Sequence, residues 1–141
     1  MSAKVRIVTD SSAYPEPEVI AKYDIRVVPL RIAFGSEVFA EGVDITNEEF
    51  YQRLVKGGKL PTTSQPTVAD FIKVYRELAE QGHPILSLHI SSKLSGTCAS
   101  ALAAKNAFPQ AQIEILDSFT IAMGMLISPA AEAAERGETL S

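Results

Sequence analysis

Hydroxyl-bearing residues gather in four short segments of the chain. These segments are Thr9–Ser12, Thr62–Gln65, Ser91–Thr97 and Asp117–Ser118. Three of them follow short apolar runs that are typical of strands, and the Thr62–Gln65 loop leads into an amphipathic run that is typical of a helix. In a parallel sheet, ligands bind beyond the carboxyl ends of the strands, where helix N-termini offer N–H donors. A carboxylate or a phosphate group is the ligand that such an edge would take.

Ser95-Gly96-Thr97 is the sequence best suited to this task. Its glycine lets a ligand approach the backbone closely, while a hydroxyl stands on either side. Thr63 and Ser64 are the central hydroxyls of the second segment, which two prolines enclose. Any one of these clusters alone is more often a helix N-cap than a binding site. The binding hypothesis therefore depends on several clusters meeting at one edge of the sheet.

Asp10 and Asp117 are the carboxylates nearest to these hydroxyls in the sequence. Either could act as a general acid or base or bind a metal ion, but an Asp that caps its own loop is the commoner case. We therefore expect Asp10, Ser11, Asp117 and Ser118 to lie in a second layer behind the direct ligands.

His83, His89 and Cys98 are expected to have structural roles. His89 falls in a run typical of a buried strand, His83 lies beside a turn, and a small cysteine is usually buried. The sequence contains no zinc-ligand spacing, no Walker or dinucleotide fingerprint and no hydrolase elbow. It therefore predicts no metal, no cofactor and no catalytic residue.

Strands and helices are expected to alternate along most of the chain. Strands are predicted at 5–8, 25–34 (two short strands, with a hairpin to 37–40), 84–90 and 112–116; helices are predicted from 18, from 46, and at 67–82, 98–108 and 120–136. This order indicates an α/β fold with a mostly parallel sheet and helices on both of its faces.

Two helix starts carry a capping-box signature, Thr46 with Glu49 and Thr67 with Asp70. In the first of these helices, we expect a buried stripe and a stop at Gly57-Gly58. The expected stripe consists of Phe50, Leu54 and Tyr51.

The last predicted helix contains Pro129, which should kink or divide it.

Composition narrows the functional classes further. The chain has 141 residues and a net charge of −4, from 13 basic and 17 acidic side chains, so it lacks the basic surface that nucleic acid requires. A lone cysteine favours a reducing cytoplasm. The apolar run 121–127 is far shorter than the ~20 residues that span a bilayer, and the N-terminal run is too short for a signal peptide.

Six motifs in order resemble the DegV family of bacterial fatty-acid-binding proteins, and the resemblance covers essentially the whole chain. The motifs are Thr9-Asp-Ser-Ser12, Val28-Pro-Leu30 with Phe34-Gly35, Glu41-Gly-Val-Asp-Ile45, Pro61-Thr-Thr-Ser-Gln-Pro66, Ser91–Thr97 and Asp117-Ser118. The resemblance implies a carrier, and not an enzyme, that holds one long-chain fatty acid and presents its carboxyl group to a fatty acid kinase. It places the carboxylate at Thr63, Ser64, Ser95 and Thr97, with Gly96 between the last two.

Two departures from the family pattern stand out. Members of the family are about twice as long and have a second domain that closes over the acyl chain. We therefore expect residues 1–141 to form a single α/β lipid-carboxylate-binding domain, the N-terminal part of a longer two-domain architecture. The apolar run Met123–Ile127 then needs a partner surface, which could be the second domain or a second copy of the chain. The second departure is Cys98, where the family more often has an aromatic residue.

Two alternatives remain open. The chain could be a small α/β enzyme that acts on a phosphorylated or carboxylated metabolite, with Asp10 or Asp117 as acid or base. It could also be a truncated fragment without independent ligand binding, which associates with itself through its apolar edge.

Overall fold

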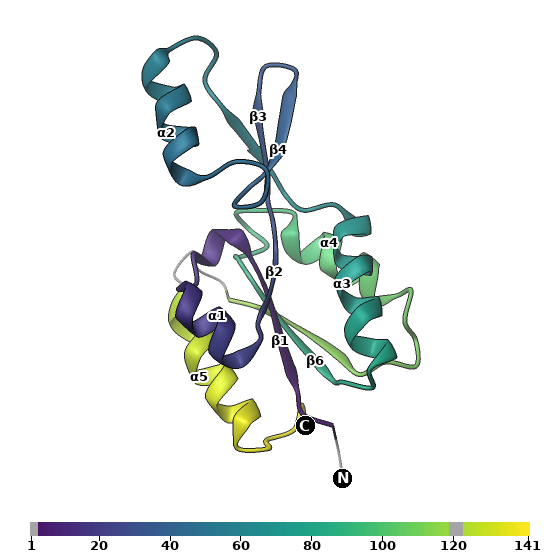
Figure 1. Ribbon diagram of the computed structural model, residues 1–141. Helices are drawn as coiled ribbons and strands as arrows, with labels where there is room; N and C mark the ends of the chain where they lie inside the picture. Colours follow the sequence, from purple (N-terminus) through teal and green to yellow (C-terminus); the bar gives the residue numbers. More distant parts are fainter. Residues whose placement is uncertain (1–2, 119–122) are drawn as a thin grey trace.

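A computed structural model describes residues 3–118 and 123–141 of the chain (Figure 1). The elements follow one another as β1 (Arg6–Asp10), a 3₁₀ turn η1 (Ser11–Ala13), α1 (Pro17–Tyr23), β2 (Arg26–Val28), β3 (Arg31–Phe34), β4 (Glu37–Ala40), α2 (Asn47–Lys56), β5 (Thr62–Ser64), α3 (Val68–Glu80), β6 (Ile85–His89), α4 (Thr97–Lys105), β7 (Ile113–Asp117) and α5 (Gly124–Glu135). The alternation of strands and helices expected from the sequence is confirmed.

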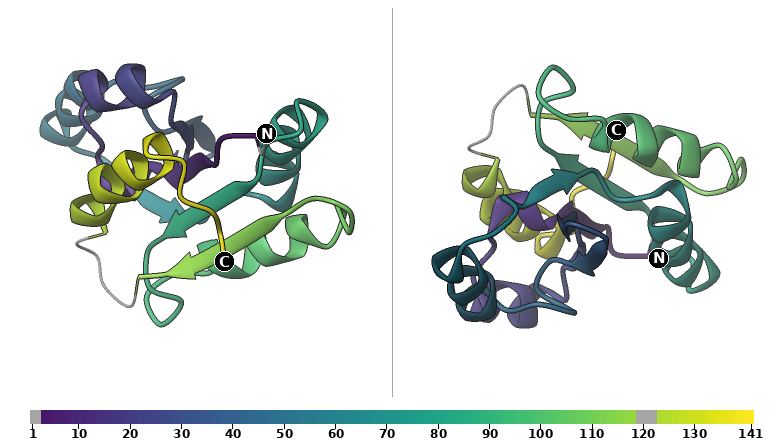
Figure 2. Two further views of the ribbon diagram at one scale, coloured as in Figure 1. Left: turned by 90° about the horizontal axis from the view of Figure 1, so that it is seen from below. Right: turned by 90° about the horizontal axis from the view of Figure 1, so that it is seen from above.

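Four of the strands form an entirely parallel sheet in the order β2-β1-β6-β7. The side chains of neighbouring β1 residues point to opposite faces of the sheet, because side chains alternate along a strand. Val8 lies in a core with α3 and α4, whereas Ile7 lies in a second core with α1 and α5. Figure 2 shows these two helix layers on either side of the sheet. Helices thus cover both faces, which explains why β6 is apolar along most of its length.

A second, smaller sheet interrupts the crossover between β2 and α3. It is antiparallel, in the order β4-β3-β5, and the hairpin between β3 and β4 turns at Gly35, whose φ of 62° suits a residue without a Cβ. Together with α2 it forms a lobe, residues 31–64, that projects beyond the carboxyl ends of the parallel strands (Figure 1). Pro29 lies between β2 and β3, at the break that the sequence indicates.

Both capping boxes are present. The Thr46 hydroxyl accepts the backbone N–H of Glu49, and the Glu49 carboxylate accepts the backbone N–H of Thr46. Thr67 and Asp70 repeat this exchange at the start of α3. These helix starts were predictable because each depends on residues three positions apart.

The stripe predicted for α2 is wrong, because α2 buries none of its residues. Tyr51 is 62% exposed and Leu54 is 39% exposed, while Phe50 is half-buried against the ring of Phe34. Phe50 and Arg53 contact the rings of Phe34 and Phe39 on the small sheet, whereas Tyr51 and Leu54 face outward. The helix ends before Gly57, whose φ of 76° agrees with the predicted stop.

One further expectation is wrong: the predicted loop at residues 62–64 forms β5, because these residues pair with the open edge of β3. Pro129 lies inside the last helix but does not divide it, since α5 continues from Gly124 to Glu135 across it. A kink at Pro129 stays a prediction. The predicted start of that helix at Thr120 lies outside the described residues.

Met123 and Ile127 are buried, and Ile127 packs on the parallel sheet with Ala131 and Ala134. The protein's own sheet therefore covers part of the run that was expected to need a partner. Met125 remains largely exposed. No helix within residues 3–118 and 123–141 has the length and apolar character needed to cross a bilayer.

Candidate functional site

Three polar residues end neighbouring strands of the parallel sheet. Asp10 is the last residue of β1, His89 of β6 and Asp117 of β7, and His89 pairs directly with Asp117 in the register. The loops that follow these strands therefore leave the sheet at one edge. This is the convergence of polar segments that the sequence predicts.

The loop after β6 folds back on Ser91 and then begins α4. The buried carbonyl of Ser91 accepts the N–H groups of Leu94 and Ser95, and its hydroxyl accepts that of Lys93. This tight turn places Ser95 directly before the N-cap of α4. The amides of the first helical turn there have no acceptor within the helix.

Ser95 and Thr97 form a coupled pair of hydroxyls. Their oxygens lie 2.8 Å apart, and Ser95 Oγ also accepts the backbone N–H of Thr97 at 3.2 Å. Two hydroxyls carry two protons, and their mutual hydrogen bond uses one of them. Either hydroxyl can donate in this bond, and Ser95 is half-buried whereas Thr97 is fully buried. When Thr97 donates to Ser95, the proton of Ser95 is left to point outward. The pair can donate one hydrogen bond to an anion at this edge.

Gly96 brings the second hydroxyl segment to the first. A Cβ on Gly96 would lie 3.0 Å from Gln65 Nε2 and 3.1 Å from Gln65 Cδ, so the Gln65 side chain occupies the space beside this glycine. Gln65 directly follows β5, which carries Thr63 and Ser64. Two predicted segments some thirty residues apart in the sequence therefore meet at the start of α4.

Thr63 and Ser64 lie on opposite faces of β5. Thr63 pairs with Ile32 of β3 and lines a cavity of about 170 Å³. The other residues that line this cavity are Tyr14, Ile32, Glu41, Ile45, Thr46, Asn47, Phe50 and Tyr51. Ser64 pairs with Arg31, whose guanidinium contacts Asp70 at 2.5 Å. Thr63 thus lines a cavity with both apolar and polar walls, while Ser64 lies near an ion pair.

Both carboxylate oxygens of Asp10 have partners inside the protein. Oδ2 is 2.8 Å from His89 Nδ1, and Oδ1 accepts the backbone N–H and the hydroxyl of Ser12. Asp10 is also fully buried. This environment is that of a buried, loop-capping carboxylate.

Asp117 accepts the N–H of Ser92, and the Ser118 N–H bonds the carbonyl of His89. Both residues therefore help to fix the polar edge from the side of β7. Among the residues that the structure describes, no three Cys, His, Asp or Glu side chains gather as metal ligands would.

Ser11 connects the parallel sheet to the lobe. Its hydroxyl accepts the N–H of Leu30, between β2 and β3, and donates to Glu41 Oε2 at 2.5 Å, just after β4. Glu41 Oε1 in turn accepts the Tyr14 hydroxyl at 3.1 Å. Ser11 thus holds both the entry to the lobe and the segment after its hairpin.

Sequence reasoning missed a buried polar network behind this edge. His89 Nε2 is 2.5 Å from Ser87 Oγ, and Ser87 Oγ accepts the Tyr75 hydroxyl at 2.7 Å. All three side chains are fully buried. One signal was available: Ser87 and His89 are two residues apart, so they share one face of a strand that is otherwise apolar.

Cys98 is unsuited to act as a nucleophile. Burial is the main cause that raises the pKa of its thiol to about 11, and the negative charges of Asp117 and Asp10 add to this effect. The thiol lies 3.6 Å from the carbonyl oxygen of Ile90. The expected structural role agrees with this environment.

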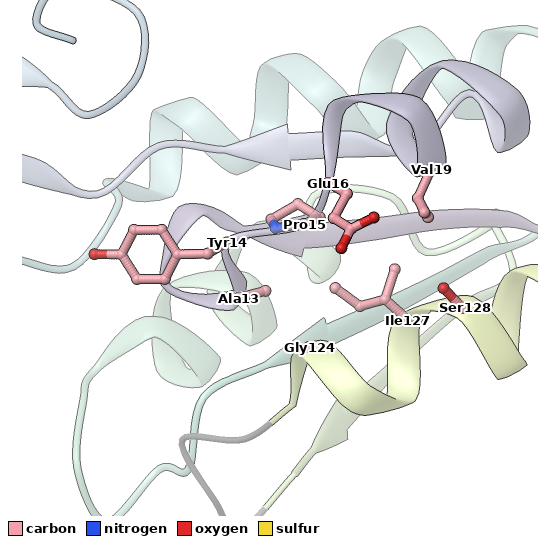
Figure 3. A pocket seen from close by; sticks show the side chains of 8 residues that line it. All are labelled: Ala13, Tyr14, Pro15, Glu16, Val19, Gly124, Ile127 and Ser128. Carbon is pink, nitrogen blue, oxygen red and sulfur yellow. The ribbon is translucent and has the colours of Figure 1, made fainter. Parts of the chain in front are cut away.

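A separate cavity of about 260 Å³ lies between η1, α1 and α5, and Figure 3 labels the eight residues that line it. They are Ala13, Tyr14, Pro15, Glu16, Val19, Gly124, Ile127 and Ser128, so none of the predicted site residues is among them.

Comparisons with known proteins place the chain in a family. A family model described as "Uncharacterised protein, DegV family" matches residues 4–141. A DegV domain-containing protein of Clostridium perfringens is 40% identical over 139 residues, which cover 97% of this chain and 50% of that protein. Protein DegV of Bacillus subtilis is 33% identical, over 94% of this chain and 48% of its own length. The chain therefore spans about half the length of these curated relatives.

Solved structures agree with this relationship. A DegV family protein from Thermus thermophilus, described by its fatty acid binding, superposes with a TM-score of 0.87 at 36% identity, over 98% of this chain and 50% of that one. A stearic-acid-binding protein from Eubacterium ventriosum gives the same TM-score and identity, over 96% of this chain and 49% of that one. The family model and the curated relatives both show that the chain belongs to the DegV family.

Proposed function

We propose that this chain is the carboxylate-binding domain of a fatty-acid-binding carrier, which holds a long-chain fatty acid and presents its carboxyl group to a fatty acid kinase in the cytoplasm. The observation that carries the proposal is the contact between Gly96 and Gln65, which joins the two hydroxyl segments at one edge of the sheet. The fatty acids bound by relatives at 36% identity support the class of ligand.

The fatty acid head would be bound by hydroxyls and backbone amides. The candidate ligands in this proposal are Thr63, Ser64, Ser95 and Thr97. One carboxylate would take Ser95, with the buried Thr97 behind it as its hydrogen-bond partner, and one hydroxyl of β5, because Thr63 and Ser64 lie on opposite faces of that strand. Gly96 leaves the backbone open beside Ser95. The Ser95–Thr97 pair has one proton to donate, and the first amides of α4 lie beside it. Neutral donors hold a carboxylate without neutralising it, so the bound carboxyl oxygen would stay available to an acceptor enzyme.

Most of the affinity would come from the acyl chain. Burying about fourteen methylenes at ~0.8 kcal/mol each contributes roughly 11 kcal/mol, against ~1.5–3 kcal/mol for each hydrogen bond to a charged head. The cavity beside Thr63 has a volume of about 170 Å³. Small-molecule sites usually occupy ~300–1,000 Å³. This cavity is therefore too small to hold the whole acyl chain. A further surface would cover the rest of it, provided by the second half of the family architecture or by a second copy of this chain.

A carrier needs no catalytic group, and the chemistry of this edge supports a role without one. The enzyme alternative depends on Asp10 or Asp117. Asp10 is buried with both oxygens bonded inside the protein, which disfavours it as a base.

Native mass spectrometry of the 141-residue chain with added stearate tests the proposal. We expect a 1:1 adduct for each copy of the chain, lost in Ser95→Ala and retained in Ser92→Ala. Ser92 is the matched control, because it lies exposed in the same loop. A chain that stays bare at every protein concentration would contradict the proposal for this domain, and an adduct that survives Ser95→Ala would contradict the site.

The same spectra report self-association. Val55 and Leu60 of the lobe and Met125 of α5 are largely exposed apolar side chains. If a second copy covers the tail, the stearate adduct should appear on the dimer and not on the monomer.

A further inference from the structure

The side chains of Tyr75, Ser87, His89 and Asp10 form one fully buried row of hydrogen bonds from α3, through β6, to the end of β1. Phe71 packs edge-on against the His89 ring, with the ring centroids 5.0 Å apart. The hydrogen bonds of these four side chains run to one another and to Ser12. Buried polar groups are costly unless they are bonded, so a row of four calls for a reason.

The hydrogen-bond partners of His89 assign which of its ring nitrogens carries a proton. An ionised Asp10 can only accept, so the proton of the His89–Asp10 bond lies on Nδ1. The Tyr75 hydroxyl donates to Ser87 Oγ, and the single proton of Ser87 then points to His89 Nε2. Burial raises the pKa of Tyr75, which keeps this donor protonated. A neutral His89 with its proton on Nδ1 leaves every donor of the row with an acceptor.

The row ends on the turn that connects the two sheets. Asp10 is the N-cap of η1 and holds the N–H of Ser12. Ser11, inside the same turn, bonds Leu30 before the lobe and Glu41 after its hairpin. An Asp10 carboxylate that rotated away would release Ser12 and, with it, the geometry of Ser11.

We infer that His89 is a positioning residue: its Nδ1–H fixes Asp10, and through the Ser11–Ser12 turn it sets the place of the lobe, and hence of Thr63, relative to Ser95 and Thr97 on the parallel sheet. The consequence for ligand binding rests on the proposed function, whereas the positioning of the lobe does not.

Two substitutions separate the role of Nδ1–H from simple filling of the core. In His89→Asn the side-chain amide can stand where Nδ1–H stands, and in His89→Leu nothing can donate. The hydrogen-exchange rate of the Leu30 amide reports local opening of the turn. The amide of Ile85, which donates to the Gln112 carbonyl at the far end of β6, serves as the reference for global unfolding. In His89→Leu we expect the Leu30 to Ile85 exchange ratio to rise about tenfold, as the loss of one hydrogen bond implies.

The ratio should stay near the wild-type value in His89→Asn and in Ser87→Ala, which removes only the partner of Nε2. The ¹⁵N shifts of the His89 ring should show a protonated Nδ1 and a bare Nε2. An unchanged ratio in His89→Leu, an equal rise in His89→Asn, or a proton on Nε2 would each overturn the inference.

Stearate binding gives the second readout. If wild-type protein binds stearate, we expect His89→Leu to bind it about tenfold more weakly and His89→Asn to bind it as wild type does. Unchanged binding in His89→Leu would overturn the inference while the proposed function stands. If wild-type protein binds none, the proposed function fails for this chain, and the exchange ratio alone decides the positioning of the lobe.

Discussion

The side chain of Gln65 lies against the backbone of Gly96, at a distance where a methyl group on Gly96 would meet Gln65 Nε2 at 3.0 Å. Gly96 has no positive φ that would require a glycine. The close approach of Gln65 is therefore the reason that the structure offers for a glycine at this position. Gly96 is therefore a point where the segment after β5 of the small sheet contacts the start of α4, which follows the parallel strand β6.

We expect Gly96→Ala to weaken stearate binding while it lowers the free energy of unfolding by less than ~1 kcal/mol, because the Gln65 amide is the end of a flexible side chain and can move. Isothermal titration calorimetry and urea unfolding measure the two effects. The double variant Gly96→Ala/Gln65→Ala is the matched control, since it removes the obstructing amide. If the single and double variants bind alike, the contact with Gln65 does not set the site.

Asp70 should make the stability of the protein depend on pH. Burial of Asp70 raises the pKa of its carboxyl, but hydrogen bonds from Arg31 and Thr67 outweigh burial and hold the pKa below the ordinary value of 3.8. A carboxyl whose pKa is lowered in the folded state contributes stability above its unfolded pKa and loses it as pH falls through the folded pKa. Urea unfolding should therefore show Asp70→Asn to be less stable than wild type at pH 5–7, with a gap that narrows below about pH 4.

Arg31→Gln removes the cation that favours the charged form of Asp70, so the pH dependence should be weaker in that background. A difference between Asp70→Asn and wild type that stays constant from neutral to acid pH would contradict this account.

Gly124 permits the close approach of α5 to η1. A Cβ at this position would lie 2.7 Å from the backbone carbonyl oxygen of Ala13, and backbone cannot rotate away as a side chain does. We expect Gly124→Ala to lower the free energy of unfolding by ~1–3 kcal/mol, the usual cost of overpacking. Ser128→Ala, one turn further along the same helix, should change it little. Equal stability of the two variants in urea would show that η1 and α5 adjust at no cost.

The Cys98 thiol should resist alkylation in the native protein. Burial raises its pKa to about 11, and the thiolate is the reactive form. Iodoacetamide at pH 8 should therefore modify native protein far more slowly than urea-unfolded protein, with a rate that rises as the pH approaches 11. Rapid native alkylation at pH 8 would mean that the thiol is neither buried nor shifted.

Local patterns predicted both capping boxes and the alternation of strands and helices, because each depends on residues close in the sequence. The parallel sheet and its polar edge were then predictable from the order of these elements. Asp10 and His89 illustrate what such patterns miss. Taken alone, Asp10 is predicted to cap a loop and His89 to lie buried in a strand. Only the pairing of β1 with β6 brings Asp10 Oδ2 within 2.8 Å of His89 Nδ1.

The lobe shows the same limit. Tyr51 and Leu54 repeat at helical spacing, which predicts a buried stripe, but the pattern cannot say which face of the helix the neighbouring sheet covers. The strand β5 was missed for a related reason, because Thr62–Ser64 has no apolar alternation and pairs only because β3 offers an open edge.

The insertion of the lobe between β2 and α3 bears on how the chain folds. Thr9 and Leu88, on the paired central strands, are 79 residues apart, and the lobe supplies residues 31–64 of the loop that their pairing closes. Loop-closure entropy grows only logarithmically with length, at about 0.6 kcal/mol for each doubling. The lobe therefore slows the pairing of the central strands by no more than a few-fold, so the sheet tolerates it kinetically. Lobes of different length could occupy the same crossover at nearly the same folding rate.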